Sequence, residues 1–397
     1  MSTINRNQLS DLRGAARLAF DATTGITALV EKMHHTIQLR PAPLGDSRAD
    51  VTRGITGLVY RSVRGATHLI GRGVDAGLAP LVALLPEGED HPTRDVWVSI
   101  VNGVYGDHLE RTDNPLAIGM HLRRGGRRVD PMRPADALPD ATGRVMVLVH
   151  GLCLNESHWT HEDSSPIEAL AASLGYTPVH LRYNSGRSIA DNGKDFAALL
   201  ETLSCHWPRP ISELAIVGHS MGGLVARSAA HHGAKAGHDW PARLRRLVFL
   251  GTPLHGAPLE RGGHRLDYVM ELSPYVAPFT KIGKARSAGI TDLRYGSITT
   301  VEKEFVPLPE GVACYAAAAI VGSRRNLVGE NLVGDGLVPL DSALGQHADP
   351  ARTFGIPAEH QWVGSSMGHL ELLHRREVYT QLRKWLREPA ARSRVGQ

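Results

Sequence analysis

The amino-acid sequence predicts an α/β fold: a mostly parallel central sheet with helices on both faces, plus an N-terminal helical hairpin. From residue 144 onward, short continuous apolar runs alternate with amphipathic segments, which is typical of βαβ units in a buried parallel sheet. Glycine (42 residues) and proline (24) are frequent, which suits many strand-to-helix turns. Before this region, residues 26–37 and 51–74 carry apolar side chains at steps of three and four, which indicates two helices.

The elements of the α/β region follow from the same patterns in chain order. A helix is expected first, and then a hairpin of two short strands around Gly125 and Gly126. The helices, including this first one, are expected at 96–109, 165–175, 191–203, 221–233 and 370–386. The strands of the parallel sheet are expected at 144–151, 176–183, 213–220, 245–253, 311–322 and 360–364.

The 397 residues are enough for one large domain with an appendage. We expect an N-terminal helical, amphipathic and basic region over residues 1–90 and an α/β domain over residues 91–390. Over fifty residues separate Pro253 from Pro307, and connections of that length are usually lids or binding elements. This length predicts a cap or lid insertion around 253–307, although packing alone would explain its apolar residues equally well.

Composition excludes several classes of protein. The three cysteines, Cys153, Cys205 and Cys314, are widely spaced and form no CxxC pair, so neither a disulfide framework nor a zinc site is expected. The N-terminus shows no apolar core of a secretory signal, and no apolar run approaches the length of a membrane span. These features predict a cytoplasmic protein. No metal-binding, Walker-type or dinucleotide-binding motif is present, so no metal and no cofactor are expected.

The net charge of +4 is concentrated near the N-terminus, where residues 1–85 hold ten basic and six acidic side chains. Four arginines lie between Val51 and Val74 with no acidic residue among them. Two interpretations stay open: this hairpin packs on the neighbouring domain or on a second subunit, or the basic helix at 51–74 lies on an anionic membrane surface. Nucleic acid is not an expected partner, because no aromatic stacking residues accompany these arginines.

A serine between two glycines is the main functional signal. Ser220 follows a buried-strand pattern and precedes a helix of small residues, the strand–turn–helix arrangement of a nucleophile elbow. Gly218 and Gly222 are expected where the backbone is tight, with His219 and Met221 flanking the serine. In the stretch GHSMGG the chain resembles the α/β-hydrolase family, specifically its bacterial esterase and lipase branch. The predicted role of Ser220 is that of the nucleophile.

The resemblance implies a histidine base and an acid downstream of the serine. His369 lies after the expected last strand and before the last helix, where members of the family carry the base; His374 and His360 are the alternatives. Asp335 lies in a DGLVP stretch similar to the loops that carry the acid in such lipases, with Asp341 as its rival.

The resemblance also implies an oxyanion site built from backbone N–H groups. One belongs to Met221, and the other to Leu152, which follows the His150–Gly151 pair. No second glycine follows Gly151, a departure that puts bulky tertiary-alcohol esters in doubt as substrates. The segment GTPLHG, with His255, is similar to lipases and to GPI inositol-deacylase-like hydrolases; a loop-structuring role for His255 is the simpler interpretation.

These residues predict a serine ester hydrolase of carboxylesterase or lipase type, acting through an acyl-enzyme on an ester with an apolar acyl group. One alternative is a membrane-docked phospholipase or acyltransferase with the same triad. Another is a non-catalytic binding protein that retains the fold. The resemblance covers residues 110–388, and the sequence leaves the acyl length, the alcohol group and the oligomeric state open.

Overall fold

The computed structural model describes residues 6–38, 65–70, 72, 74–75, 92–160, 164–257, 287–301, 304–322 and 334–387. The chain forms two compact units, one of residues 1–90 and 109–117 and the other of residues 91–108 and 118–397.

In the first unit, helix α1 (Arg6–Gln38) is much longer than the expected helix over 26–37. It begins earlier because residues 12–20 are rich in alanine, leucine and arginine, which are strong helix formers. The Asp75 carboxylate accepts hydrogen bonds from Arg13 (2.6 Å) and Arg17 (2.5 Å), which hold the pKa of Asp75 well below its usual range. Most of the expected helix over 51–74 lies outside the described residues, and so does most of the cap, 258–286.

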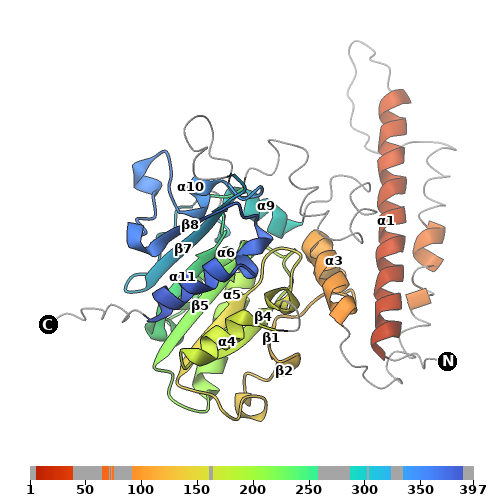
Figure 1. The fold of residues 1–397 in the computed structure, drawn as a ribbon. Helices are drawn as coiled ribbons and strands as arrows, with labels where there is room; N and C mark the ends of the chain where they lie inside the picture. The colour runs from red at the N-terminus through yellow and green to blue at the C-terminus, as the bar shows by residue number, and fades with distance from the viewer. Residues whose placement is uncertain are drawn as a thin grey trace. The chain divides into compact units, whose positions relative to one another are not determined.

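The second unit contains an eight-stranded sheet, shown in Figure 1. The antiparallel hairpin of β1 (His121–Arg124) and β2 (Arg127–Val129) pairs with the rest of the sheet through β1, which runs antiparallel to β4. The other strands are all parallel, so the prediction of a mostly parallel sheet is confirmed. In spatial order from the hairpin, they are β4 (Thr177–Arg182), β3 (Arg144–Val149), β5 (Glu213–His219), β6 (Leu244–Leu250), β7 (Ala313–Ile320) and β8 (Gln361–Ser365).

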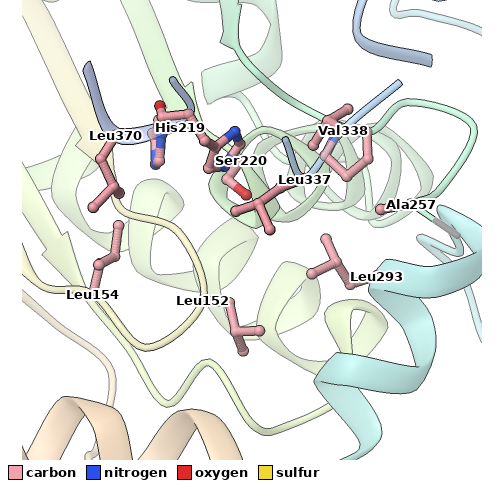
Figure 2. Close-up of a pocket in the computed structure, with 11 residues that line it drawn as sticks. Leu152, Leu154, His219, Ser220, Ala257, Leu293, Leu337, Val338 and Leu370 are labelled. Carbon is pink, nitrogen blue, oxygen red and sulfur yellow. Dashed lines mark hydrogen bonds between the residues drawn. The ribbon is translucent and has the colours of Figure 1, made fainter. Parts of the chain in front are cut away.

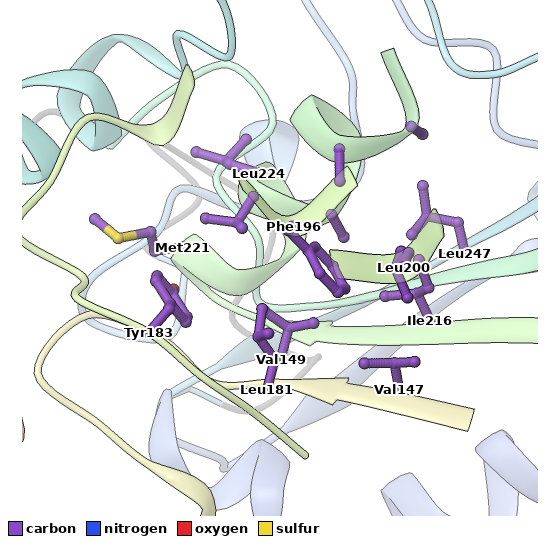
Figure 3. Close-up of a cluster of buried hydrophobic side chains, with 14 of the residues drawn as sticks. Val147, Val149, Leu181, Tyr183, Phe196, Leu200, Ile216, Met221, Leu224 and Leu247 are labelled. Atoms are coloured by element: carbon purple, nitrogen blue, oxygen red, sulfur yellow. The ribbon is translucent and has the colours of Figure 1, made fainter. Parts of the chain in front are cut away.

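Helices cover both faces of this sheet. The helices are α3 (Pro92–Arg111), α4 (Pro166–Ser173), α5 (Ile189–His206), α6 (Met221–Lys235), α9 (Ala288–Tyr295), α10 (Leu340–Ala343) and α11 (Arg376–Arg387). One apolar core joins the sheet to α5 and α6, with Phe196 and Leu224 packed over Val149, as Figure 3 shows. A second core joins the opposite face to α4 and α11 and contains Trp385.

The expected single helix over 370–386 is wrong. Residues Leu370–Leu373 form a 3-10 helix, and α11 begins only at Arg376. In one continuous helix Leu373 would face away from Val378 and Trp385, yet all three side chains are buried. The break at His374 allows Leu373, before it, and Val378 and Trp385, after it, all to enter the core.

Candidate active site

Ser220 lies in the sharp turn between β5 and α6. Its φ of 53° and ψ of −124° place a non-glycine residue in a left-handed backbone conformation, which costs on the order of 1–3 kcal/mol. The surrounding backbone holds this turn: the Ser220 N–H donates to the carbonyl of Leu250 (2.8 Å), and the Ser220 carbonyl accepts from the N–H of Gly223 (3.1 Å). The hydroxyl is therefore presented at the carboxyl edge of the parallel strands, next to the N-terminus of α6.

The glycines around Ser220 allow β5, α6 and β3 to approach closely. A Cβ atom on Gly218 would lie 2.5 Å from the Cα of Gly223, and one on Gly222 would lie 2.3 Å from the carbonyl oxygen of Val149. Both neighbours are backbone atoms that cannot rotate away. The tight turn is thus possible only with glycine at these two positions.

Asp335 and His369 are joined by a hydrogen bond of 2.6 Å between Nδ1 of the imidazole and Oδ2 of the carboxylate. Both residues are buried. The other carboxylate oxygen of Asp335 accepts the backbone N–H groups of Leu337 (3.0 Å) and Val338 (2.9 Å), so the carboxyl group cannot turn. Because Nδ1 donates its hydrogen to Asp335, the neutral His369 ring has its lone pair on Nε2.

The alternative acid and bases lie elsewhere. Asp341 is exposed on α10, and it is Asp335 that contacts His369. His374 occupies the break before α11. His360 bonds through Nδ1 to the carbonyl of Cys314 (3.1 Å), and its ring lies 4.2 Å from that of Tyr315. The structure therefore brings together one acid and one histidine from the candidates that the sequence left open.

Ser220 and His369 line one small pocket of about 30 Å³. His219 also lines it and its remaining walls are apolar; Figure 2 shows Leu152, Leu293 and Leu337 around the serine. Within the described part of the chain, no hydrogen bond links the Ser220 hydroxyl to His369. Ser220 and His369 line the same pocket, and proton transfer between them is part of the function proposed below.

The loop after β3 packs directly against the serine. A Cβ atom on Gly151 would lie 3.0 Å from the Cβ of Ser220, so the loop that carries Leu152 runs beside the nucleophile. Among the backbone hydrogen bonds of the described segments, the N–H groups of Leu152 and Met221 donate to no protein acceptor. These two groups are the donors that the proposal below assigns to the oxyanion.

His150 holds this loop in place. Its ring stacks on Tyr183 at 4.3 Å, and the Tyr183 hydroxyl donates to the His150 carbonyl (2.9 Å). Burial lowers the pKa of His150 to about 3, so the ring stays neutral at physiological pH.

His219 has a contact that sequence reasoning missed. Its Nε2–H donates to the backbone carbonyl of His369 (3.2 Å), and the two rings lie 4.8 Å apart. Burial, with the neighbouring His369, lowers the pKa of His219 well below its usual value, so the ring is neutral and fixed as a donor. Adjacency of His219 to Ser220 was the only available signal, and it does not reveal a bond to a residue 150 positions later.

The described residues contain neither a metal-binding cluster nor a membrane-spanning helix. No group of three or more His, Cys, Asp or Glu side chains is arranged to hold a metal ion there. No helix in that part of the chain combines the length and apolar character needed to span a bilayer.

The chain is similar to one family model and, at low identity, to several solved structures. A family model described as a domain of unknown function (DUF7379) matches residues 122–294. No curated protein matches the chain by sequence. Among solved structures, the mature lipase BlEst2 of Bacillus licheniformis is 20% identical with a TM-score of 0.43, over 68% of this chain and 98% of that one. An esterase of Pyrococcus furiosus is 13% identical with a TM-score of 0.38, over 62% and 81%. Lipase B of Aspergillus fumigatus is 13% identical with a TM-score of 0.38, over 70% and 58%.

The chain's own topology establishes its fold class. The mostly parallel eight-stranded sheet carries helices on both faces, and a strained serine stands at the turn between β5 and α6. This is the α/β-hydrolase fold, as the resemblance in GHSMGG implied.

Proposed function

We propose that the protein is a serine ester hydrolase in which Ser220, His369 and Asp335 form the catalytic triad. The observation that carries this proposal is the buried 2.6 Å hydrogen bond between His369 and Asp335, beside a pocket that His369 shares with Ser220. An imidazole oriented in this way accepts a proton from a serine hydroxyl, which is a weak nucleophile until a base removes that proton.

In the proposed reaction, the Ser220 Oγ attacks the ester carbonyl carbon while His369 Nε2 takes the hydroxyl proton. The Asp335 carboxylate stabilises the imidazolium, and the N–H groups of Met221 and Leu152 donate to the developing oxyanion. The tetrahedral intermediate then collapses, and His369 returns the proton to the leaving alcohol. Water attacks the acyl-enzyme by the same steps, which releases the acid and restores the serine.

The pocket favours a small apolar acyl group. Its walls are formed mainly by leucine, valine, proline and alanine side chains, which offer no charged partner to the substrate. The small size of the pocket favours a short acyl group over a long fatty acyl chain. We therefore expect p-nitrophenyl acetate to be cleaved faster than the palmitate ester, measured as kcat/KM across the series in the presence and absence of detergent.

A fluorophosphonate probe tests the proposed nucleophile directly. We expect one labelled peptide that contains Ser220, no labelling of Ser220→Ala, and a loss of p-nitrophenyl acetate turnover of several orders of magnitude in that variant. His369→Gln should lose both signals, whereas its matched control His374→Gln keeps them. An unlabelled wild-type protein would favour the alternative of a non-catalytic binding protein, and labelling that survives Ser220→Ala would identify a different nucleophile.

A further inference from the structure

A second pocket lies near the Ser220 pocket, and the segment after β6 and helix α9 contribute residues to both. Its volume is about 230 Å³, much larger than the catalytic pocket. The segment after β6 contributes to both, with Pro253 in the first pocket and His255 in the second. Helix α9 does the same, through Leu293 and then Arg294. None of the catalytic residues proposed above lines this second pocket.

Arg227 is the unusual residue of this pocket. It lies on α6, about 10 Å along the helix from Ser220. It is only 4% exposed, and its Nη2 donates to the Val306 carbonyl (2.8 Å) while its guanidinium lies over the Phe354 ring at 4.3 Å. Its Nε and Nη1 have no hydrogen-bond partner among the described residues. Burial lowers the pKa of Arg227 to about 10, and the group remains charged at neutral pH.

The chain's own acidic side chains do not neutralise this charge within the described segments. Glu304 is the carboxylate that lines the pocket, and it accepts a hydrogen bond from the Thr299 hydroxyl (2.5 Å). No ion pair of the described residues joins Glu304 to Arg227. Burying an unpaired charge is costly, and among the described residues no carboxylate offsets that cost for Arg227.

Arg352 and His347 add hydrogen-bond donors to this pocket. Arg352 has its Nε without a partner among the described residues. His347 accepts the N–H of Asp349 at Nδ1 (3.0 Å), which leaves a hydrogen on Nε2 in the neutral ring. The ring of His255 lies 4.9 Å from that of His347, and burial, together with the positive charges nearby, lowers the pKa of His255 to about 4.

We propose that this pocket binds a small molecule with a phosphate group, which Arg227 neutralises from below and Arg352 and His347 contact from the rim. A single carboxylate would satisfy one arginine, whereas a phosphate offers more acceptor oxygens and close to two negative charges. The aromatic rings of Phe305 and Phe354, stacked at 5.1 Å, form an apolar wall for the organic part of the molecule.

Isothermal titration of the full-length protein with inorganic phosphate tests this assignment, with sodium chloride at matched ionic strength as the blank. We expect saturable binding in the wild type and at least tenfold weaker binding in Arg352→Gln and in His347→Gln. The matched control is Arg133→Gln, because the Arg133 side chain is 74% exposed outside the pocket; it should bind like the wild type. Arg227→Met should abolish binding, and the two rim variants keep the test valid if that variant fails to fold.

Two further titrations define the ligand class. Glycerol 3-phosphate should bind more tightly than inorganic phosphate if the aromatic wall receives an organic group, and acetate should bind at least tenfold more weakly. Absence of phosphate binding, equal binding of acetate, or equal weakening by Arg133→Gln would overturn the proposal. Ser220→Ala should retain phosphate binding, so this test succeeds or fails separately from the proposed ester hydrolysis.

Discussion

Helix α6 connects two pockets that contain buried charges in opposite situations. At its N-terminus, the Asp335 carboxylate receives two backbone N–H groups and the imidazole of His369, so every partner comes from the chain. Two turns later, Arg227 is equally buried but has two nitrogens without a partner among the described residues. Because all its partners come from the chain, the Asp335 carboxylate keeps one orientation, as the proposed catalytic cycle requires. A charge without a partner among the described residues, such as that of Arg227, is the basis of the proposed phosphate site.

The largest expected effect concerns the satisfied charge. Asp335→Asn should lower kcat on p-nitrophenyl acetate by about 10⁴-fold, because the amide no longer holds the reactive tautomer of His369 or stabilises the imidazolium. The matched control is Asp341→Asn, the rival acid, which is exposed on α10 and should stay within twofold of the wild type. If the two variants lose activity equally, Asp335 has no special role in orienting the base.

The second prediction compares two buried arginines. Arg182 pairs with Asp95 (2.8 Å) and Glu156 (2.8 Å). Arg182→Met leaves Glu156 with Arg123 and leaves Asp95 with only the 3.5 Å contact to Arg94, and it should lower the free energy of unfolding by about 3 kcal/mol. Arg227→Met removes a charge that has no carboxylate partner among the described residues. It should change the free energy of unfolding by less than about 1 kcal/mol in phosphate-free buffer. Urea denaturation of both variants measures the difference. Similar losses would mean that Arg227 is neutralised by the chain itself.

The third prediction concerns the start of α6, where backbone packing rather than charge is decisive. Gly222→Ala would place a methyl group 2.3 Å from the Val149 carbonyl oxygen and 2.5 Å from that of His150. We expect a loss of about 3 kcal/mol in the free energy of unfolding and loss of esterase activity. Gly119→Ala, where the added atom meets nothing within 4 Å, serves as the control in the same urea titration and should be nearly neutral.

The two pockets also differ in how much of each could be predicted from the sequence. The central strands are rich in apolar residues, and the glycines of the elbow lie within a few positions of Ser220. The strands of the parallel sheet and the turn at Ser220 can therefore be predicted from local patterns. The choice of Asp335 over Asp341 came from a resemblance between loops, and the contact with His369 agrees with it. The strand and elbow patterns and the loop resemblance at Asp335 can each be read from a short stretch of sequence.

The features that sequence reasoning missed depend on tertiary contacts. Arg227 lies in a helix of small residues, and nothing local to it shows that two of its nitrogens have no hydrogen-bond partner among the described residues. The bond from His219 to the His369 carbonyl joins distant segments. The break at His374 arises because two sets of apolar residues with different helical phases reach the same core. In each case the decisive partner is remote in the chain.

The smallest expected effect concerns Asp292, a half-buried carboxylate. It tests whether partial burial of a charge lowers the free energy of unfolding, as the reasoning for Arg227 assumes. Asp292 on α9 accepts the N–H of Ile189 (2.8 Å), and burial, reinforced by the nearby Asp191, raises its pKa to about 6. Because the folded-state pKa lies above the unfolded one, the folded protein holds this proton more tightly. The contribution of Asp292 to stability is therefore complete below about pH 4 and declines as the pH rises through about 6.

Asp292→Asn carries no charge at any pH, so its advantage over the wild type should build up between about pH 4 and about pH 6 and be complete above that range. Since the group is partly exposed, we expect about 1 kcal/mol at pH 8 and no difference attributable to ionisation at pH 4. The control is Asp191→Asn. Burial raises the Asp191 pKa, but hydrogen bonds from Ser188 and Lys194 outweigh it and lower the pKa, so this variant should lose stability at pH 8. Urea denaturation at both pH values measures each effect. A pH-independent difference for Asp292→Asn would show that its burial carries no electrostatic cost, which would weaken the same reasoning for Arg227.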